Sequence, residues 1–108
     1  MNSYLLLALA IIFEVLGTLL LPVSKNLSKA LPSVLLLVCY SISFYLLSII
    51  SQRLPLAIIY ASWAGLGVFS IALLSSIIYK QNLNLQVIIG LFLIVLGVII
   101  VNLFKEPL

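Results

Sequence analysis

The sequence contains no histidine, a single cysteine and only two acidic residues, and these absences exclude several kinds of functional site. Without histidine there is no imidazole ligand for zinc and no base for a Ser-His-Asp triad. Cys39 alone cannot form an intrachain disulfide or a multi-cysteine metal cage. We therefore expect no metal, no cofactor, no catalytic residues and no enzymatic activity.

Charge is equally scarce, because only 6% of the residues are charged while 66% are hydrophobic and the mean hydropathy is +1.46. A water-soluble domain of 108 residues cannot bury so much apolar surface, whereas a bilayer favours it. The basic residues are too few and too dispersed for a nucleic-acid-binding patch: Lys25, Lys29, Arg53, Lys80 and Lys105. We expect a protein that is embedded in membrane lipid and binds no nucleic acid.

The prolines lie at the edges of four long apolar runs. These runs cover residues 4–21, 33–51, 56–79 and 85–104. Each is close to the roughly 20 residues that a helix needs to cross the hydrocarbon core. The short polar connections between them require neighbouring helices to run antiparallel. The pattern predicts an all-α membrane protein in which residues 1–108 form one domain of four transmembrane helices.

The basic residues give the chain almost no preferred orientation in the membrane. With four spans, Arg53 and Lys105 share one side, and Lys25, Lys29 and Lys80 share the other. The positive-inside rule therefore gives no firm topology, although the side with three lysines is weakly favoured. Four helices are also too few to enclose a solute path, and many transporters build theirs from inverted repeats. We expect a dual-topology, antiparallel dimer.

Glu14 is the only acidic residue inside an apolar run. A charge at the bilayer centre costs about 3 kcal/mol on insertion scales, so such a residue is expected to be functional. The residues on its helical face are Leu7, Ala10, Ile11, Gly17, Thr18 and Leu21. Ala10 and Gly17 leave space beside the carboxylate, and Thr18 offers it a local hydrogen bond. We expect Glu14 to bind and release protons, while a purely structural hydrogen bond is the alternative.

Aromatic residues at mid-depth indicate the ligand. Trp63 lies about two turns inside the third run, with Tyr60 three residues earlier on the same face, and Tyr40 and Phe44 form a pair in the second run. Aromatic rings attract cations through their π-faces, and a carboxylate neutralises the charge. The pattern favours a lipophilic cation held by Glu14, Tyr60, Trp63 and Tyr40. We expect Tyr4, Ser43 and Phe44 to line the pocket, although interfacial or packing roles would also explain Tyr4 and Phe44.

Two pairs of glycines have distinct expected roles. Gly65 and Gly67 lie mid-span, where they allow close packing or a hinge. Gly90 and Gly97 share a helical face with Leu93 and Ile94, and this stripe is the expected dimer interface. Packing within one bundle is the alternative for both pairs. Asn102 is expected to make a hydrogen bond at the helix end or to another helix.

With these residues the chain resembles the small multidrug resistance family along nearly its whole length. The matching segments are Glu14-Val15-Leu16-Gly17-Thr18, Pro32-Ser33, Tyr40, Ser43-Phe44, Pro55, Tyr60-Ala61-Ser62-Trp63, Gly65-Leu66-Gly67 and the stretch from Gly90 to Gly97. The resemblance implies an antiparallel dimer in the bacterial inner membrane that exports cations in exchange for protons. Proton and substrate would compete for Glu14.

The same resemblance bears on the substrate. The guanidinium-exporting branch has a tryptophan where this chain has Gly17, so the quaternary-ammonium and multidrug branch is favoured. The chain departs from the usual pattern of that branch at Pro22, Ala57, Ile59 and Ala64. Ile59 and Ala64 are close in sequence to Tyr60 and Trp63, so a smaller or drier pocket is expected. Choline- or betaine-like osmolytes, polyamines and a heterodimer with a paralogue are the alternatives.

A protein of another class also places one carboxylate within hydrophobic helices. In an ion-translocating proteolipid subunit the carboxylate faces a neighbouring subunit in a ring. That arrangement would leave Tyr60 and Trp63 without a cation to bind. We therefore prefer the transporter.

Overall fold

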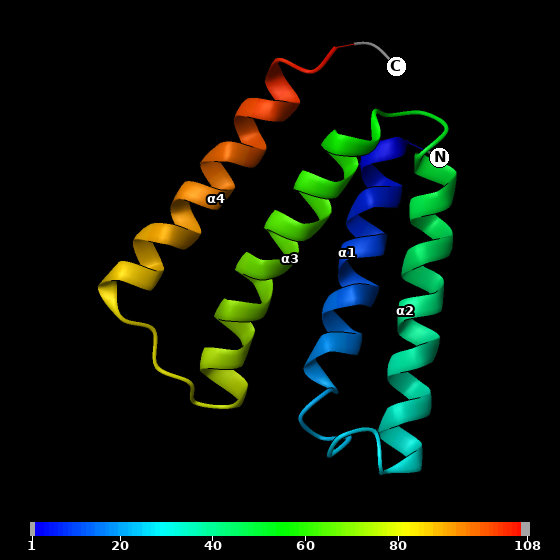
Figure 1. Ribbon diagram of the computed structural model, residues 1–108, viewed down its shortest axis with the longest axis vertical. Helices are drawn as coiled ribbons and strands as arrows, with labels where there is room; N and C mark the ends of the chain where they lie inside the picture. The colour runs from blue at the N-terminus through cyan, green and yellow to red at the C-terminus, as the bar shows by residue number, and fades with distance from the viewer. Residues whose placement is uncertain (1, 107–108) are drawn as a thin grey trace. The chain divides into compact units, whose positions relative to one another are not determined.

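A computed structural model describes residues 2–106, which form four α-helices. They are α1 (Ser3–Leu19), α2 (Ala30–Ile50), α3 (Leu56–Ile78) and α4 (Leu85–Leu103). The chain divides into two compact units, one up to Arg53 and one from Leu54 onward. We call α1 with α2 the first hairpin and α3 with α4 the second hairpin. Figure 1 shows the two helices of each hairpin side by side and antiparallel.

The helix starts follow from capping residues. The Asn2 side chain accepts a hydrogen bond from the Tyr4 backbone N–H at 2.7 Å, and Asn84 accepts one from Val87 at 2.8 Å. Both caps satisfy a backbone donor that has no partner within its own helix. Pro55 is the N-cap of α3, where its missing N–H costs nothing. α2 starts before Pro32, which occupies its first turn, a position that tolerates proline for the same reason.

α1 ends earlier than the apolar pattern indicates. Beyond Leu19 the backbone tightens, and the N–H groups of Leu20 and Leu21 bond to carbonyls three residues back, on Gly17 and Thr18. Pro22 then follows and has no N–H to continue the helix. As a result α1 has 17 residues, while α2, α3 and α4 are the three helices long and apolar enough to cross a membrane.

A left-handed turn joins α1 to α2. Lys25, Asn26 and Leu27 have φ values of 48°, 61° and 64°, a region that side-chain-bearing residues seldom adopt. The buried Ser24 stabilises the turn, because its hydroxyl accepts from the Leu27 N–H at 3.2 Å and donates to the Leu21 carbonyl at 2.7 Å. The turn thus reverses the chain within ten residues between α1 and α2.

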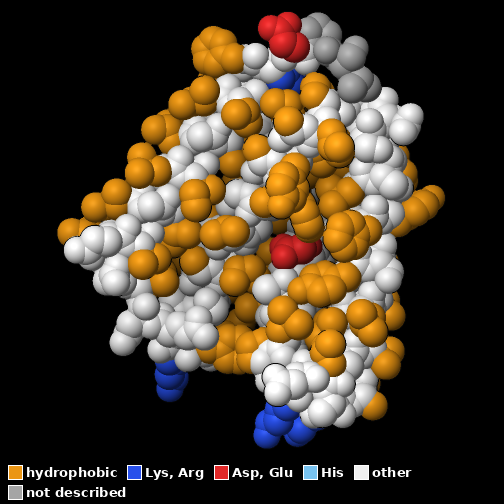
Figure 2. Space-filling view, in the orientation of Figure 1, with side chains coloured by type: hydrophobic (Ala, Val, Ile, Leu, Met, Phe, Trp, Pro, Cys, Tyr) orange, Lys and Arg blue, Asp and Glu red, His pale blue; other side chains and the backbone are white. Residues whose placement is uncertain are grey.

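Each hairpin buries little of its apolar surface. Val98 is the one fully buried residue of α4, and Leu31, Leu56 and Leu103 are each 71% exposed. Figure 2 shows hydrophobic side chains over most of the visible face and basic side chains only near helix ends. Such continuous apolar surface requires lipid or another protein to cover it. The all-α membrane fold is therefore built from helices whose outer faces suit a bilayer.

Candidate functional site

Glu14 lies near the middle of α1 and is half-buried at the edge of the contact with α2. Four of the residues on its predicted face are fully buried: Leu7, Ala10, Ile11 and Gly17. Thr18 is half-buried and Leu21, which lies past the helix end, is exposed. The carboxylate therefore lies beside a small-residue contact between two helices.

A chain of hydrogen bonds connects Glu14 to α2. The Thr18 hydroxyl donates to Oε1 of Glu14 at 2.8 Å, and the Thr18 and Tyr40 hydroxyl oxygens are also 2.8 Å apart. Thr18 has one hydroxyl hydrogen, which it gives to Glu14, so Tyr40 must donate to Thr18. The order of donation is Tyr40 to Thr18 to Glu14, so Oε1 accepts a hydrogen bond from within the first hairpin.

The second carboxylate oxygen of Glu14 differs from the first in its hydrogen bonding. Oε2 of Glu14 is buried and makes no hydrogen bond within the part of the chain that the structure describes. A buried polar atom without a partner is costly and calls for an explanation. One oxygen is thus held by the protein, while the other can accept a proton or face a cation without breaking an existing bond.

Gly17 allows Tyr40 to reach this position. A Cβ atom at Gly17 would lie 2.9 Å from Cε1 of Tyr40 and 3.3 Å from the Leu36 carbonyl oxygen, so only glycine fits without a shift. Nearby, the buried Ser43 hydroxyl donates to the Ala10 carbonyl at 2.7 Å. These contacts bring α1 and α2 close together on both sides of the level of Glu14.

The aromatic pair belongs to the second hairpin. The ring centroids of Tyr60 and Trp63 are 5.9 Å apart and the rings are tilted by 39°, which is a favourable geometry for an aromatic pair. Tyr60 is 64% exposed and Trp63 is half-buried. Of the other predicted aromatic residues, Tyr4 and Phe44 are both exposed on the first hairpin. Tyr60 and Trp63 therefore present a joint aromatic surface.

The glycines of the second hairpin differ in what surrounds them. A Cβ at Gly65 would lie 2.5 Å from Cγ2 of Val98, so Gly65 is packed directly against α4. A Cβ at Gly90 or Gly97 would meet no atom within 4 Å in the described chain. α3 is continuous through Gly65 and the buried Gly67, and their hinge role stays a prediction.

The predicted dimer stripe lies on an open face of α4. Leu93 and Ile94 are exposed, at 61% and 40%. Gly97 and Ile94 line a shallow hollow of about 450 Å³ together with small residues of α3, among them Ala61 and Ala64. The dimer interface itself stays a prediction, but its residues are accessible to a partner.

The residues that depart from the family pattern occupy different places in the structure. Ile59 is buried in the second hairpin at 3% exposure, so it acts through packing. Ala64 lines the shallow hollow beside α4, and Ala57 is exposed at the start of α3. Pro22 lies in the turn that follows α1. Ala64 is thus the departure that lies on a described concave surface.

One polar contact was not predicted as a pair. The Asn102 side-chain amide donates to the Ser62 hydroxyl at 2.8 Å and to the Val98 carbonyl at 2.9 Å. Ser62 is 1% exposed, so this bond connects α3 to α4 inside the second hairpin. Both residues interrupt apolar runs, but a role was predicted only for Asn102, as a hydrogen bond at the helix end or to another helix.

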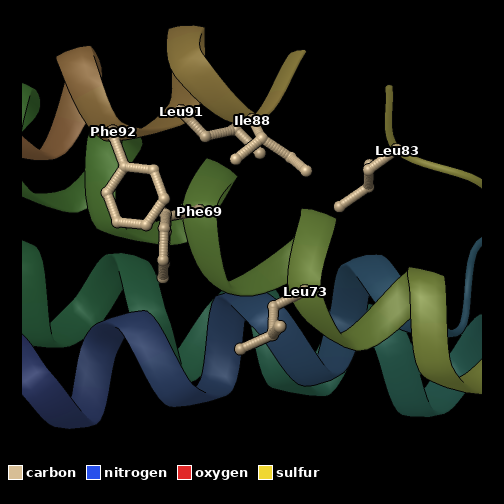
Figure 3. A pocket seen from close by; sticks show the side chains of 6 residues that line it. All are labelled: Phe69, Leu73, Leu83, Ile88, Leu91 and Phe92. Carbon is tan, nitrogen blue, oxygen red and sulfur yellow. The ribbon is translucent and has the colours of Figure 1, made fainter. Parts of the chain in front are cut away.

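A further hollow of about 220 Å³ lies between α3 and the start of α4 (Figure 3). Its lining is entirely apolar: Phe69, Leu73, Leu83, Ile88, Leu91 and Phe92. It offers no charge to bind a cation. Among the residues that the structure describes, no three metal-binding side chains are grouped together either.

Apolar helices, a single carboxylate within them and a pair of neighbouring aromatic residues are the features expected of a small multi-pass membrane transporter. The sequence matches the family described as Small Multidrug Resistance protein over residues 2–94. This chain therefore belongs to the small multidrug resistance family, and it is a transporter of the bacterial inner (plasma) membrane, not an enzyme.

Three relatives show the branch. The quaternary ammonium compound-resistance protein QacG of Staphylococcus sp. (strain ST94) is 43% identical over 103 residues, covering 95% of this chain and 96% of its own. QacH of Staphylococcus saprophyticus, of the same description, is 44% identical over 101 residues, or 94% of each chain. The multidrug transporter EmrE of Escherichia coli (strain K12) is 44% identical over 106 residues, covering 98% of this chain and 96% of its own. The predicted quaternary-ammonium and multidrug branch is thus confirmed.

Proposed function

We propose that this protein is a proton-coupled antiporter that exports lipophilic or quaternary-ammonium cations. The observation that carries the proposal is the difference between the two carboxylate oxygens of Glu14. Oε1 accepts a hydrogen bond from Thr18, whereas Oε2 is buried and has no hydrogen-bond partner among residues 2–106. A proton and a cation both require the same negative charge, so the two compete for it. The names of the relatives support the substrate class.

The aromatic pair supports the same substrate. Tyr60 and Trp63 present π-faces from α3, and such faces attract cations that carry little bound water. We propose that both rings contact the cation while Glu14 neutralises its charge, with Tyr40 adjusting the carboxylate through Thr18. The remaining lining would come from Tyr4 and Phe44, which are exposed, while the buried Leu7, Ala10, Ile11, Gly17 and Ser43 would form the wall behind them. Apolar walls of this kind favour a lipophilic ligand over an osmolyte or a polyamine.

Transport then follows from competition. The cation binds from the cytoplasm when Glu14 is ionised, the loaded protein rearranges, and protons from outside displace the cation. The membrane potential contributes about 2.3 kcal/mol per charge per 100 mV. We propose an antiparallel homodimer that pairs through the Gly90–Gly97 stripe, because the open space beside both glycines permits close helix approach. A heterodimer with a paralogue is the alternative assembly.

The decisive experiment measures proton release when cations are added to the purified protein in detergent, with wild type beside Glu14→Gln. The panel contains tetraphenylphosphonium, benzalkonium, choline, betaine, spermidine and guanidinium. We expect release by wild type alone, at the lowest concentration with tetraphenylphosphonium or benzalkonium. Release at the lowest concentration with choline, betaine or spermidine would favour the alternative substrates. Equal release by Glu14→Gln would overturn the competition at Glu14.

A further inference from the structure

α3 packs against α4 with one face and carries the aromatic pair on the opposite face. At about 100° per residue, Ser62 and Gly65 lie on one side of the helix, and Tyr60 and Trp63 lie on the other. The first side contacts α4, through the Asn102 amide on Ser62 and Val98 on Gly65. The second side carries the aromatic pair. A rotation of α3 against α4 would therefore change the direction in which both rings point.

The contact on the first side includes a directional bond as well as apolar packing. Apolar packing of Val98 and Ile94 on Gly65 permits small rotations and sliding, since dispersion contacts have little angular preference. A hydrogen bond weakens steeply when its angle changes. The 2.8 Å bond from Asn102 to Ser62 therefore restricts the rotation of α3 against α4 more than the apolar packing does.

The surroundings make this bond costly to break. Ser62 is 1% exposed and lies in an apolar helix of a membrane protein, where water is scarce. Asn102 is itself tied to its own helix through the Val98 carbonyl at 2.9 Å. The amide is thus anchored on α4 at the same time as it bonds to α3.

We propose that Ser62 and Asn102 are positioning residues that orient Tyr60 and Trp63 and so set the preference for aromatic over aliphatic cations. This inference rests on the proposed function, because it assigns a role in cation recognition. It goes beyond that function, because neither residue needs to touch the cation. Their effect on binding passes through the orientation of α3.

The test compares Ser62→Ala with Ser76→Ala. Ser76 is in the same helix, but its hydroxyl donates at 2.7 Å to the Leu73 carbonyl of α3 itself. Binding of tetraphenylphosphonium and of tetrapropylammonium is measured for each variant. We expect Ser62→Ala to weaken the binding of tetraphenylphosphonium about three- to tenfold, which corresponds to the free energy of an interhelical hydrogen bond in a membrane. The binding of tetrapropylammonium should weaken less than about twofold. Ser76→Ala should change neither.

Trp63 provides an independent readout, because it is the only tryptophan in the sequence. Its emission reports its environment without any ligand. We expect the emission maximum and its quenching by an aqueous quencher to change in Ser62→Ala and Asn102→Ala and to stay the same in Ser76→Ala. The double variant should bind tetraphenylphosphonium no more weakly than either single variant, because both substitutions remove the same hydrogen bond.

The outcomes separate the two hypotheses. Wild type that neither binds cations nor releases protons overturns the proposed function, and this inference with it. Wild type that does both, with equal weakening of the two cations or additive losses in the double variant, overturns the positioning role alone. Should Ser62→Ala fail to insert into membranes, Asn102→Ala and Asn102→Gln provide the same comparison. Asn102→Gln keeps the amide, so it should retain more of the aromatic preference, and equal loss in both would count against the proposal.

Discussion

The hydroxyl of Thr18 donates a 2.8 Å hydrogen bond to Oε1 of Glu14, one helical turn before it on α1. Because Tyr40 in turn donates to Thr18, the carboxylate is connected to α2 through a single side chain. Thr18 therefore controls how well the site tolerates a charged Glu14. This relationship and the neighbouring contacts support five predictions.

Glu14→Gln should abolish proton-coupled transport, because glutamine keeps the shape of the side chain but cannot titrate. Glu14→Asp should keep activity with an altered pH dependence, since the shorter side chain changes the distance to Thr18. The measurement is uptake of tetraphenylphosphonium into proteoliposomes driven by a pH gradient. Gradient-driven uptake by Glu14→Gln at the wild-type rate would refute the proposed coupling.

Thr18→Val should weaken cation binding about tenfold, because it removes a hydrogen bond to a charged group while keeping the side-chain volume. Thr18→Ser retains the hydroxyl and is the matched control. Titration calorimetry with tetraphenylphosphonium at one fixed pH is sufficient. A Thr18→Val protein that binds like Thr18→Ser would show that the bond to Oε1 contributes nothing to the charged state.

Gly17→Ala should destabilise the first hairpin by about 1–3 kcal/mol, the usual cost of overpacking. Its new methyl group would lie 2.9 Å from the Tyr40 ring. Replacing the tyrosine ring by a smaller side chain, in the double variant Gly17→Ala/Tyr40→Leu, should recover part of the lost stability. The measurement is unfolding in a denaturing detergent, followed by helix content. If the double variant recovers no stability, the new methyl group clashes with the Leu36 carbonyl oxygen and not with the Tyr40 ring.

Trp63→Ala should weaken the binding of aromatic cations more than that of aliphatic cations of similar size, because the π-face is lost. Tetraphenylphosphonium and tetrapropylammonium form a suitable pair of ligands. Trp63→Phe keeps an aromatic face and should retain most of the preference. Equal loss of both ligands in Trp63→Ala would argue against recognition through π-faces.

Substitutions at the two kinds of glycine in the second hairpin should separate folding from assembly. Gly97→Leu should reduce dimerisation but preserve helix content, because a Cβ atom there meets no atom within 4 Å in the described chain. Gly65→Leu should reduce helix content as well, because Val98 occupies the space. Cross-linking in membranes and circular dichroism measure the two properties. An unchanged dimer fraction in Gly97→Leu would exclude this stripe as the interface.

The sequence predicted four helices because apolar runs of membrane length are unambiguous. The end of α1 and the start of α2 differ from the predicted runs, because both depend on local structure: the backbone tightens after Leu19, and the first turn of α2 accommodates Pro32. The face of Glu14 was predictable from helical spacing, and Thr18 does bond to Glu14. The approach of Tyr40 over Gly17 was not, because it depends on how two helices pack.

The same difference explains the missed pair in the second hairpin. Ser62 and Asn102 are 40 residues apart, and no periodic pattern connects positions on different helices. A polar residue in an apolar run indicates only that a partner exists. The identity of the partner depends on the register between α3 and α4, which is a property of the folded hairpin.

The polar bonds of this chain also bear on how it enters the membrane. The cross-helix bonds of the first hairpin, from Tyr40 to Thr18 and from Ser43 to Ala10, join α1 to α2, and the bond from Asn102 to Ser62 joins α3 to α4. Each hairpin therefore satisfies these groups by itself, without a hydrogen bond from the other hairpin. The segment between them carries one charge, on Arg53, which by itself contributes little to a preferred orientation in the membrane.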